Sequence, residues 1–163
     1  MSTQVPKPAM APGDLPPDAK IGIVAARFNA AIVEELLAGC LRRLAELNVV
    51  ETNIQVHHVP GAFELPLAAR LMARTRRFDA IICLGCVIRG QTPHFDYVAG
   101  ECASGIQRVA LDEMVPVIFG VLTTNTEQQA RERAGGAHGH AGQRAADAAA
   151  EMIVLARSLR KYS

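Results

Sequence analysis

The strongest constraint on the fold is a regular alternation, after Lys20, of short apolar runs with longer amphipathic segments. The apolar runs have strand length and predict strands over residues 21–26, 80–87 and 115–122. Residues 54–59, which end at Pro60-Gly61, predict a further strand. Between and after them, apolar residues recur every three or four positions, which is typical of helices packed on one face. These segments predict helices over residues 31–47, 63–77, 92–113, 126–134 and 143–160.

Strands that alternate with helices imply a parallel sheet with helices on both of its faces. Strands that are apolar throughout fit a sheet that is buried on both sides. The predicted fold class is therefore α/β, a three-layer α/β/α sandwich around a four-stranded parallel sheet. Residues 1–19 contain five prolines and little to bury, so we expect a flexible Pro-rich N-terminal arm outside the core. One domain then spans residues 20–163.

The composition argues against several classes of function. A formal net charge of +1 attracts neither nucleic acid nor an anionic membrane, and the absence of Trp leaves few rings on which bases could stack. The amino terminus lacks the apolar core of a signal peptide, and no apolar stretch is long enough to span a bilayer. We therefore expect a cytoplasmic protein without nucleic-acid or membrane partners, in which the four cysteines stay reduced.

In parallel sheets of this kind, ligands bind beyond the carboxyl ends of the strands. The first two strand ends carry Phe28, Gly61 and Glu64. Phe28 can stack on a planar heterocycle or plug the end of the sheet as a core residue. Gly61 permits a tight turn and close approach of a ligand. Glu64 lies in the first turn of a predicted helix, where a carboxylate is stabilised with or without a ligand.

The segment after the third strand, residues 86–94, carries the most chemistry. Thr92 followed by Pro93 predicts a capped helix start, whose free N–H groups suit an anion such as phosphate. His94 lies in the first turn, where the positive end of the helix dipole disfavours imidazolium. A neutral histidine beside a phosphate pocket is a candidate acid/base group, and the alternative is an ordinary surface histidine.

The last strand end offers Phe119, and the helix after it ends at Arg133. Arg133 either bonds a phosphate or only stabilises the carboxyl end of its helix. A Cys-x-x-Cys pattern at 83–86 lies along a strand rather than at a helix start, which disfavours a redox role. The histidines at 138–140 lie in a Gly-rich stretch without nearby Cys or carboxylates, so we expect no metal site there.

Taken together, five segments resemble the 6,7-dimethyl-8-ribityllumazine synthase family in order and spacing. They are residues 26–29, 60–66, 85–96, 119–124 and 132–135, within a resemblance that runs from about Lys20 to Arg160. The resemblance implies a flavodoxin-like fold and a transferase of riboflavin biosynthesis. An enzyme of this family would condense 5-amino-6-(D-ribitylamino)uracil with 3,4-dihydroxy-2-butanone 4-phosphate. The products would be the lumazine, phosphate and water, and no cofactor or metal would be needed.

The resemblance also implies a role for each matched residue. His94 would be the acid/base residue, and the phosphate substrate would be bound by Gln91, Thr92 and Arg133. The pyrimidine substrate would be held by Phe28, Ala62, Phe63, Glu64, Cys86, Val87, Ile88 and Phe119. Phe119 and Arg133 would come from a neighbouring subunit, so the protein would form pentamers or larger shells. Riboflavin synthase is a further candidate partner.

The chain departs from the family pattern in a few places. Ala141 stands where many members carry Lys, Gln91 and Pro93 replace small or hydroxyl residues, and Cys86 replaces a common Thr. Two alternatives remain at this stage. One is a flavodoxin-like module that binds a flavin, lumazine or nucleotide without turnover, and the other is a cage-forming relative with a degraded site.

Overall fold

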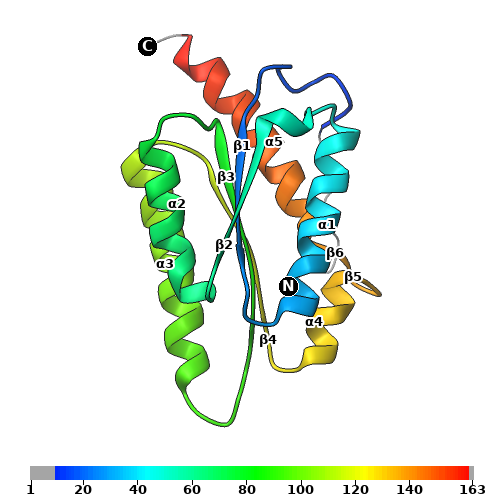
Figure 1. The fold of residues 1–163 in the computed structure, drawn as a ribbon, viewed down its shortest axis with the longest axis vertical. Helices are drawn as coiled ribbons and strands as arrows, with labels where there is room; N and C mark the ends of the chain where they lie inside the picture. The colour runs from blue at the N-terminus through cyan, green and yellow to red at the C-terminus, as the bar shows by residue number, and fades with distance from the viewer. Residues whose placement is uncertain (1–9, 162–163) are drawn as a thin grey trace.

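A computed structural model describes residues 10–161 of the chain and contains a four-stranded, all-parallel sheet in the order β2-β1-β3-β4 (Figure 1). The strands are β1 (Ile21–Ala26), β2 (Ile54–Val59), β3 (Ala80–Ile88) and β4 (Val117–Thr124). The main helices are α1 (Ala30–Glu46), α2 (Leu65–Arg74), α3 (His94–Glu113), α4 (Glu127–Arg133) and α5 (Ala141–Arg160). This arrangement confirms the predicted three-layer α/β/α fold.

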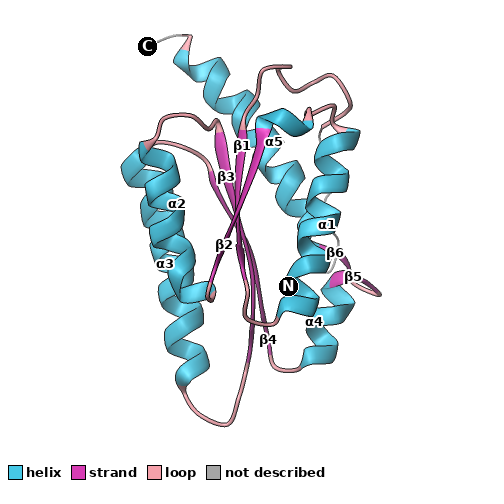
Figure 2. Cartoon of the chain, viewed as in Figure 1, coloured by secondary structure: helices cyan, strands magenta, loops and turns pink. Residues whose placement is uncertain are grey.

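The two faces of the sheet are covered by different helices, α2 and α3 on one side and α1, α4 and α5 on the other (Figure 2). Alternation along the strands divides the core accordingly. In β1, Ile23 packs in the cluster beneath α1 and α5, whereas Val24 packs in the cluster beneath α2 and α3. Every residue of β1 is buried, as expected for a central strand of a parallel sheet. No helix within residues 10–161 is both long and apolar enough to cross a membrane.

Several element boundaries differ from the sequence predictions. The second helix begins as a 3₁₀ turn, η2 (Ala62–Glu64), and α2 stops at Arg74 because Arg76 adopts a left-handed backbone. A further 3₁₀ turn, η1 (Glu51–Asn53), leads into β2. β4 starts two residues later than predicted and reaches Thr124, which pairs with Ile88 at the end of β3. The predicted cap at Thr126 is confirmed, since its hydroxyl accepts the Gln129 N–H at 3.2 Å.

The last part of the expected N-terminal arm belongs to the core, which corrects the prediction for those residues. Leu15 and Ala19 are 6% and 1% exposed and pack in the cluster beneath α1 and α5. Arg157 of α5 bonds Asp18 at 2.7 Å and also pairs with Asp79 before β3. The prolines limit hydrogen bonding in this segment, but they do not prevent its two apolar side chains from packing. Residues 1–9 lie outside the described part of the chain.

The Gly-rich segment before α5 forms a short hairpin, β5 (Ala134–Gly136) and β6 (Gly139–His140), rather than a simple break. His140 closes the hairpin and caps α5, because its Nδ1 accepts the Gly142 N–H at 3.2 Å. Its imidazole lies against Gly39 of α1, where a Cβ would overlap the ring. His140 therefore has a structural role, tying the hairpin to α1 and α5.

Acidification is expected to destabilise the protein through His140. Burial lowers the pKa of His140, and the positive charges of Arg42 and Arg144 lower it further against the opposing effect of Glu35. Above the ordinary value of 6.5, the ring is neutral in both states and its contribution to stability is complete. As the pH falls below that value, the unfolded chain takes up the proton first, so the free energy of unfolding falls until the folded-state pKa is passed.

Thermal unfolding between about pH 7.5 and about pH 5.5 measures this effect. The melting temperature of wild type should fall more steeply with acidification than that of His140→Asn, because asparagine caps a helix without titrating. The comparison concerns the slopes, since the variant also leaves a space beside Gly39. Equal slopes in the two proteins would show that His140 is not responsible.

Candidate active site

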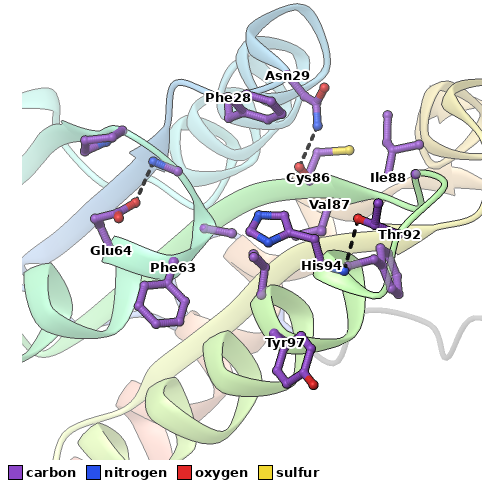
Figure 3. A pocket seen from close by; sticks show the side chains of 16 residues that line it. Phe28, Asn29, Phe63, Glu64, Cys86, Val87, Ile88, Thr92, His94 and Tyr97 are labelled. Carbon is purple, nitrogen blue, oxygen red and sulfur yellow. Dashed lines mark hydrogen bonds between the residues drawn. The ribbon is translucent and has the colours of Figure 1, made fainter.

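The carboxyl ends of β1, β2 and β3 and the start of α3 enclose a pocket of about 610 Å³ (Figure 3). Most of the residues predicted for the site line this pocket: Phe28, Ala62, Phe63, Glu64, Cys86, Val87, Ile88, Thr92 and His94. They come from three separate loops and a helix start, which parallel pairing brings to one edge of the sheet. Within one chain, Gln91, Phe119 and Arg133 are absent from its wall.

Phe28 follows β1 and is 72% exposed, so it does not plug the end of the sheet. The turn that presents it is held by backbone bonds from Arg27 to Val59 and from Phe28 to Pro60, at 2.8 and 3.0 Å. The next residue, Asn29, precedes α1 with a left-handed backbone, φ 58°. The backbone at Phe28 is thus held in place, and its exposed ring lies at the pocket.

The side chain of Asn29 does not cap α1, which corrects the sequence prediction. Its Nδ2 instead donates to the carbonyl oxygen of Cys86 at 2.8 Å. This bond links the ends of β1 and β3, which carry two walls of the pocket (Figure 3). The bond joins residues far apart in the sequence, and helix-capping preferences, which concern neighbouring residues, could not predict it.

The loop after β2 is shaped by a bond within it. The Gly61 N–H donates to Oε2 of Glu64 at 2.9 Å, and the Glu64 N–H donates to the Gly61 carbonyl at 3.2 Å. Gly61 is extended, with φ −153°, so its backbone conformation does not itself require glycine. Glu64 stabilises the turn and lines the pocket as well, so its structural and binding roles are compatible.

His94 is the first residue of α3, and its imidazole points into the pocket (Figure 3). The helix starts at His94, one residue later than predicted, and Pro93 rather than Thr92 occupies the N-cap position. Tyr97 and Val98 lie three and four residues further on, face the same side of α3, and line the pocket too. Sequence reasoning missed these two residues, although their spacing from His94 was a usable signal.

Phe119 and Arg133 lie elsewhere on the chain. Phe119 is 43% exposed and pairs with Cys83, about 10 Å back along the sheet from Cys86. It lines a separate hollow of about 280 Å³ between β4 and α5. Arg133, at the end of α4, donates from Nη1 to the Gln129 carbonyl at 2.9 Å. A role for either residue in this pocket requires another copy of the chain.

The cysteines are buried and free. Cys86 forms part of the pocket wall, and burial raises its pKa to about 11, so it is a neutral thiol at neutral pH. Cys83 and Cys86 pack in clusters on opposite faces of the sheet, which prevents a disulfide between them. Residues 10–161 hold no cluster of three His, Cys, Asp or Glu side chains suited to a metal ion.

A parallel α/β sandwich with a pocket at the carboxyl ends of its strands defines the class of the protein as flavodoxin-like. Within this class, a sequence model of the 6,7-dimethyl-8-ribityllumazine synthase family matches residues 18–157. The chain belongs to this family. The match runs from before β1 into α5 and therefore includes all the loops that form the pocket.

Proposed function

We propose that the protein condenses 5-amino-6-(D-ribitylamino)uracil with 3,4-dihydroxy-2-butanone 4-phosphate to form 6,7-dimethyl-8-ribityllumazine, phosphate and water. The observation that carries the proposal is the position of His94, at a helix start and facing a pocket that also presents a free aromatic ring. Family membership supports the reaction class, a transferase of riboflavin biosynthesis.

The pyrimidine substrate is proposed to lie at the end of the pocket between β1 and β2. The free face of Phe28 offers a stacking surface for its ring. Residues Ala62, Phe63 and Glu64 form the adjacent 3₁₀ turn, and the ribityl chain is proposed to bind Glu64. Val87 and Ile88 continue the wall along the end of β3.

The phosphate substrate is proposed to lie at the start of α3. Thr92 and the backbone at Gly90 line this end of the pocket, next to the first turn of a 20-residue helix. Such a helix start favours an anion through its free N–H groups and the helix dipole. Gln91 is exposed and lies outside the pocket wall of the isolated chain, so its proposed contribution depends on the bound substrate or a neighbouring subunit.

The chemistry needs repeated proton transfer between two oriented substrates. The amine of the pyrimidine attacks the ketone, and the adduct loses water to give an imine. The imine tautomerises and eliminates phosphate, which leaves a carbonyl after a further tautomerisation. The ribityl-bearing amine then closes the ring on this carbonyl with loss of a second water. His94 is proposed to take a proton from the attacking amine and to deliver one to the departing hydroxyl. Orientation of the two substrates in one pocket supplies much of the remaining acceleration.

The complete site is proposed to form between subunits, with Phe119 and Arg133 supplied by a neighbour in a pentamer or a larger shell. The family resemblance supports this arrangement, and neither residue lines the pocket of its own chain. Sedimentation tests it directly, and an active monomer at micromolar concentration would contradict it.

Replacing Arg133 with alanine is expected to raise the KM for the butanone phosphate about tenfold or more, because a charge-assisted bond to phosphate is lost. The KM for the pyrimidine should change little. Mixed oligomers then test the sharing of the site. Co-assembly of Arg133→Ala with His94→Ala subunits should restore about one intact site in four if the two residues act across an interface. No recovery above the two separate variants would place both residues in one subunit.

The experiment that tests the reaction itself is an absorbance assay for lumazine formation, run with a parallel assay for released phosphate. A binding module would bind the pyrimidine tightly but release no phosphate. A cage-forming relative would assemble and yet show no turnover. Lumazine and phosphate appearing together in the presence of both substrates is the result that we expect.

A further inference from the structure

Arg89 is the first residue after β3 and opens the loop 89–93, which leads to α3 and carries Thr92. Its backbone is fixed, because its N–H donates to the carbonyl of Thr124 at 2.8 Å and so extends the pairing of β3 with β4. Arg89 does not line the pocket. Any influence on the bound substrates must therefore pass through other residues.

The guanidinium of Arg89 contacts two elements besides its own. Nη2 and Nη1 bond the two carboxylate oxygens of Asp96, in the first turn of α3, at 3.0 and 3.3 Å. Nε donates to Oδ1 of Asn125, in the turn before α4, at 3.2 Å. The group also stacks over Phe95 at 4.3 Å from the ring centroid, and Phe95 is part of the pocket wall.

A single exposed ion pair usually contributes little to stability, and the Arg89 and Asp96 side chains are 43% and 58% exposed. The contacts of Arg89 matter instead because they fix the orientation of its side chain. Two parallel bonds, a third bond and a stacking contact orient the plane of the guanidinium against two segments, α3 and the turn before α4. Within the loop 89–93, the other side-chain hydrogen bond is a long one, 3.5 Å between the Thr92 hydroxyl and the His94 N–H.

We propose that Arg89 and Asp96 form a clamp that positions the phosphate-binding loop and His94 relative to each other. This proposal rests on the proposed function of the pocket. Asp96 lies two residues after His94, and Thr92 lies three residues after Arg89, so the clamp spans both ends of the short connection. Arg89 is a positioning residue in this proposal, since it does not line the pocket and its fork is directed at Asp96.

The variants Arg89→Lys and Asp96→Asn separate positioning from simple electrostatics. Lysine keeps the charge but loses the fork and the planar stack. Asparagine removes a negative charge near the phosphate site, which by charge alone would strengthen phosphate binding. If the clamp positions the loop, both variants should weaken phosphate binding. Arg74→Lys is the matched control, because Arg74 also pairs across two helices, with Glu113 at 3.0 Å, and lies away from the pocket.

We expect the KM for the butanone phosphate to rise about five- to tenfold in Arg89→Lys and Asp96→Asn, with a smaller fall in kcat. The KM for the pyrimidine should stay within about twofold, because Phe28 and Glu64 lie on other loops. The double variant should be no worse than either single one, since the two residues act as a unit. Arg74→Lys should match wild type, and melting temperatures check that every variant is folded.

The dissociation constant for inorganic phosphate, measured by calorimetry on the same proteins, separates failure of the clamp from failure of the proposed function. Suppose first that wild type forms lumazine, so that the proposed function stands. The clamp is then wrong if both variants have the wild-type kinetic constants, or if Asp96→Asn binds phosphate more tightly than wild type. If wild type binds phosphate but forms no lumazine, the function fails. The clamp is then supported by weaker phosphate binding in both variants and contradicted by unchanged binding. Absence of phosphate binding in wild type would overturn the clamp.

Discussion

Replacing His94 with alanine is expected to slow lumazine formation by about a hundred- to a thousandfold, the usual contribution of one general acid/base group. The side chain points into the pocket from the first residue of α3 and is exposed there, so its removal disturbs no core packing. Binding of the pyrimidine and the state of assembly should therefore be unchanged. The rate under saturating substrates, a binding titration with the pyrimidine and sedimentation measure the three properties.

A matched control is His57→Ala, which removes an exposed histidine of β2 that does not line the pocket. It should turn over like wild type. Added imidazole should restore part of the rate of His94→Ala, because the vacated pocket can admit the free base. If His94→Ala turned over as fast as wild type, the assignment of His94 as the acid/base residue would be wrong.

Replacing Gly142 with alanine is expected to lower the free energy of unfolding by about 2 kcal/mol, which corresponds to a melting temperature lower by about 4–8 °C. Gly142 is buried in the first turn of α5, where a Cβ would overlap the Leu36 carbonyl of α1. The obstacle is backbone, so no side-chain rotation relieves it. Alanine is intrinsically better than glycine in a helix by about 1 kcal/mol, and the loss of close packing outweighs this gain.

Gly100→Ala provides the control for helix propensity. Gly100 is exposed in α3, and beyond its own stretch of helix no atom of residues 10–161 lies within 4 Å of a Cβ placed there. This variant should be unchanged or more stable by about 0.5–1 kcal/mol. Both should be melted at the same protein concentration, because assembly adds to apparent stability. Only Gly142→Ala is expected to be destabilising, and a stabilising effect of that variant would contradict the packing of α1 against α5.

The layered α/β fold follows from local patterns, and these were readable in the chain. β1 and β2 have the predicted bounds. β1 is a continuous apolar run, and β2 is ended by the turn residues Pro60-Gly61. The helix ends were harder to predict, since they depend on competing local bonds. Thr126 caps α4 as predicted, whereas Asn29 bonds across the sheet to Cys86 instead of capping α1.

The loops that form the pocket were identified from strand order and motif content together, and most of the predicted residues line it. Tyr97 was not predicted, because it lies beyond the loop, one turn into α3. The burial of Leu15 was not predicted, because a high proline content limits backbone hydrogen bonding but does not determine which side chains pack in the core.

Residue types and their periodicity thus determined the layers of this protein, the edge of the sheet at which it binds, and the family whose motifs it carries. Only the tertiary structure decided which distant groups meet there. The Asn29 amide donates to the Cys86 carbonyl, and Arg89 bonds Asp96 and Asn125. Phe119 and Arg133 lie outside the pocket of their own chain. These contacts join residues on separate elements, and the geometry that sets them is the register of strands packed side by side, which no local pattern of sequence contains.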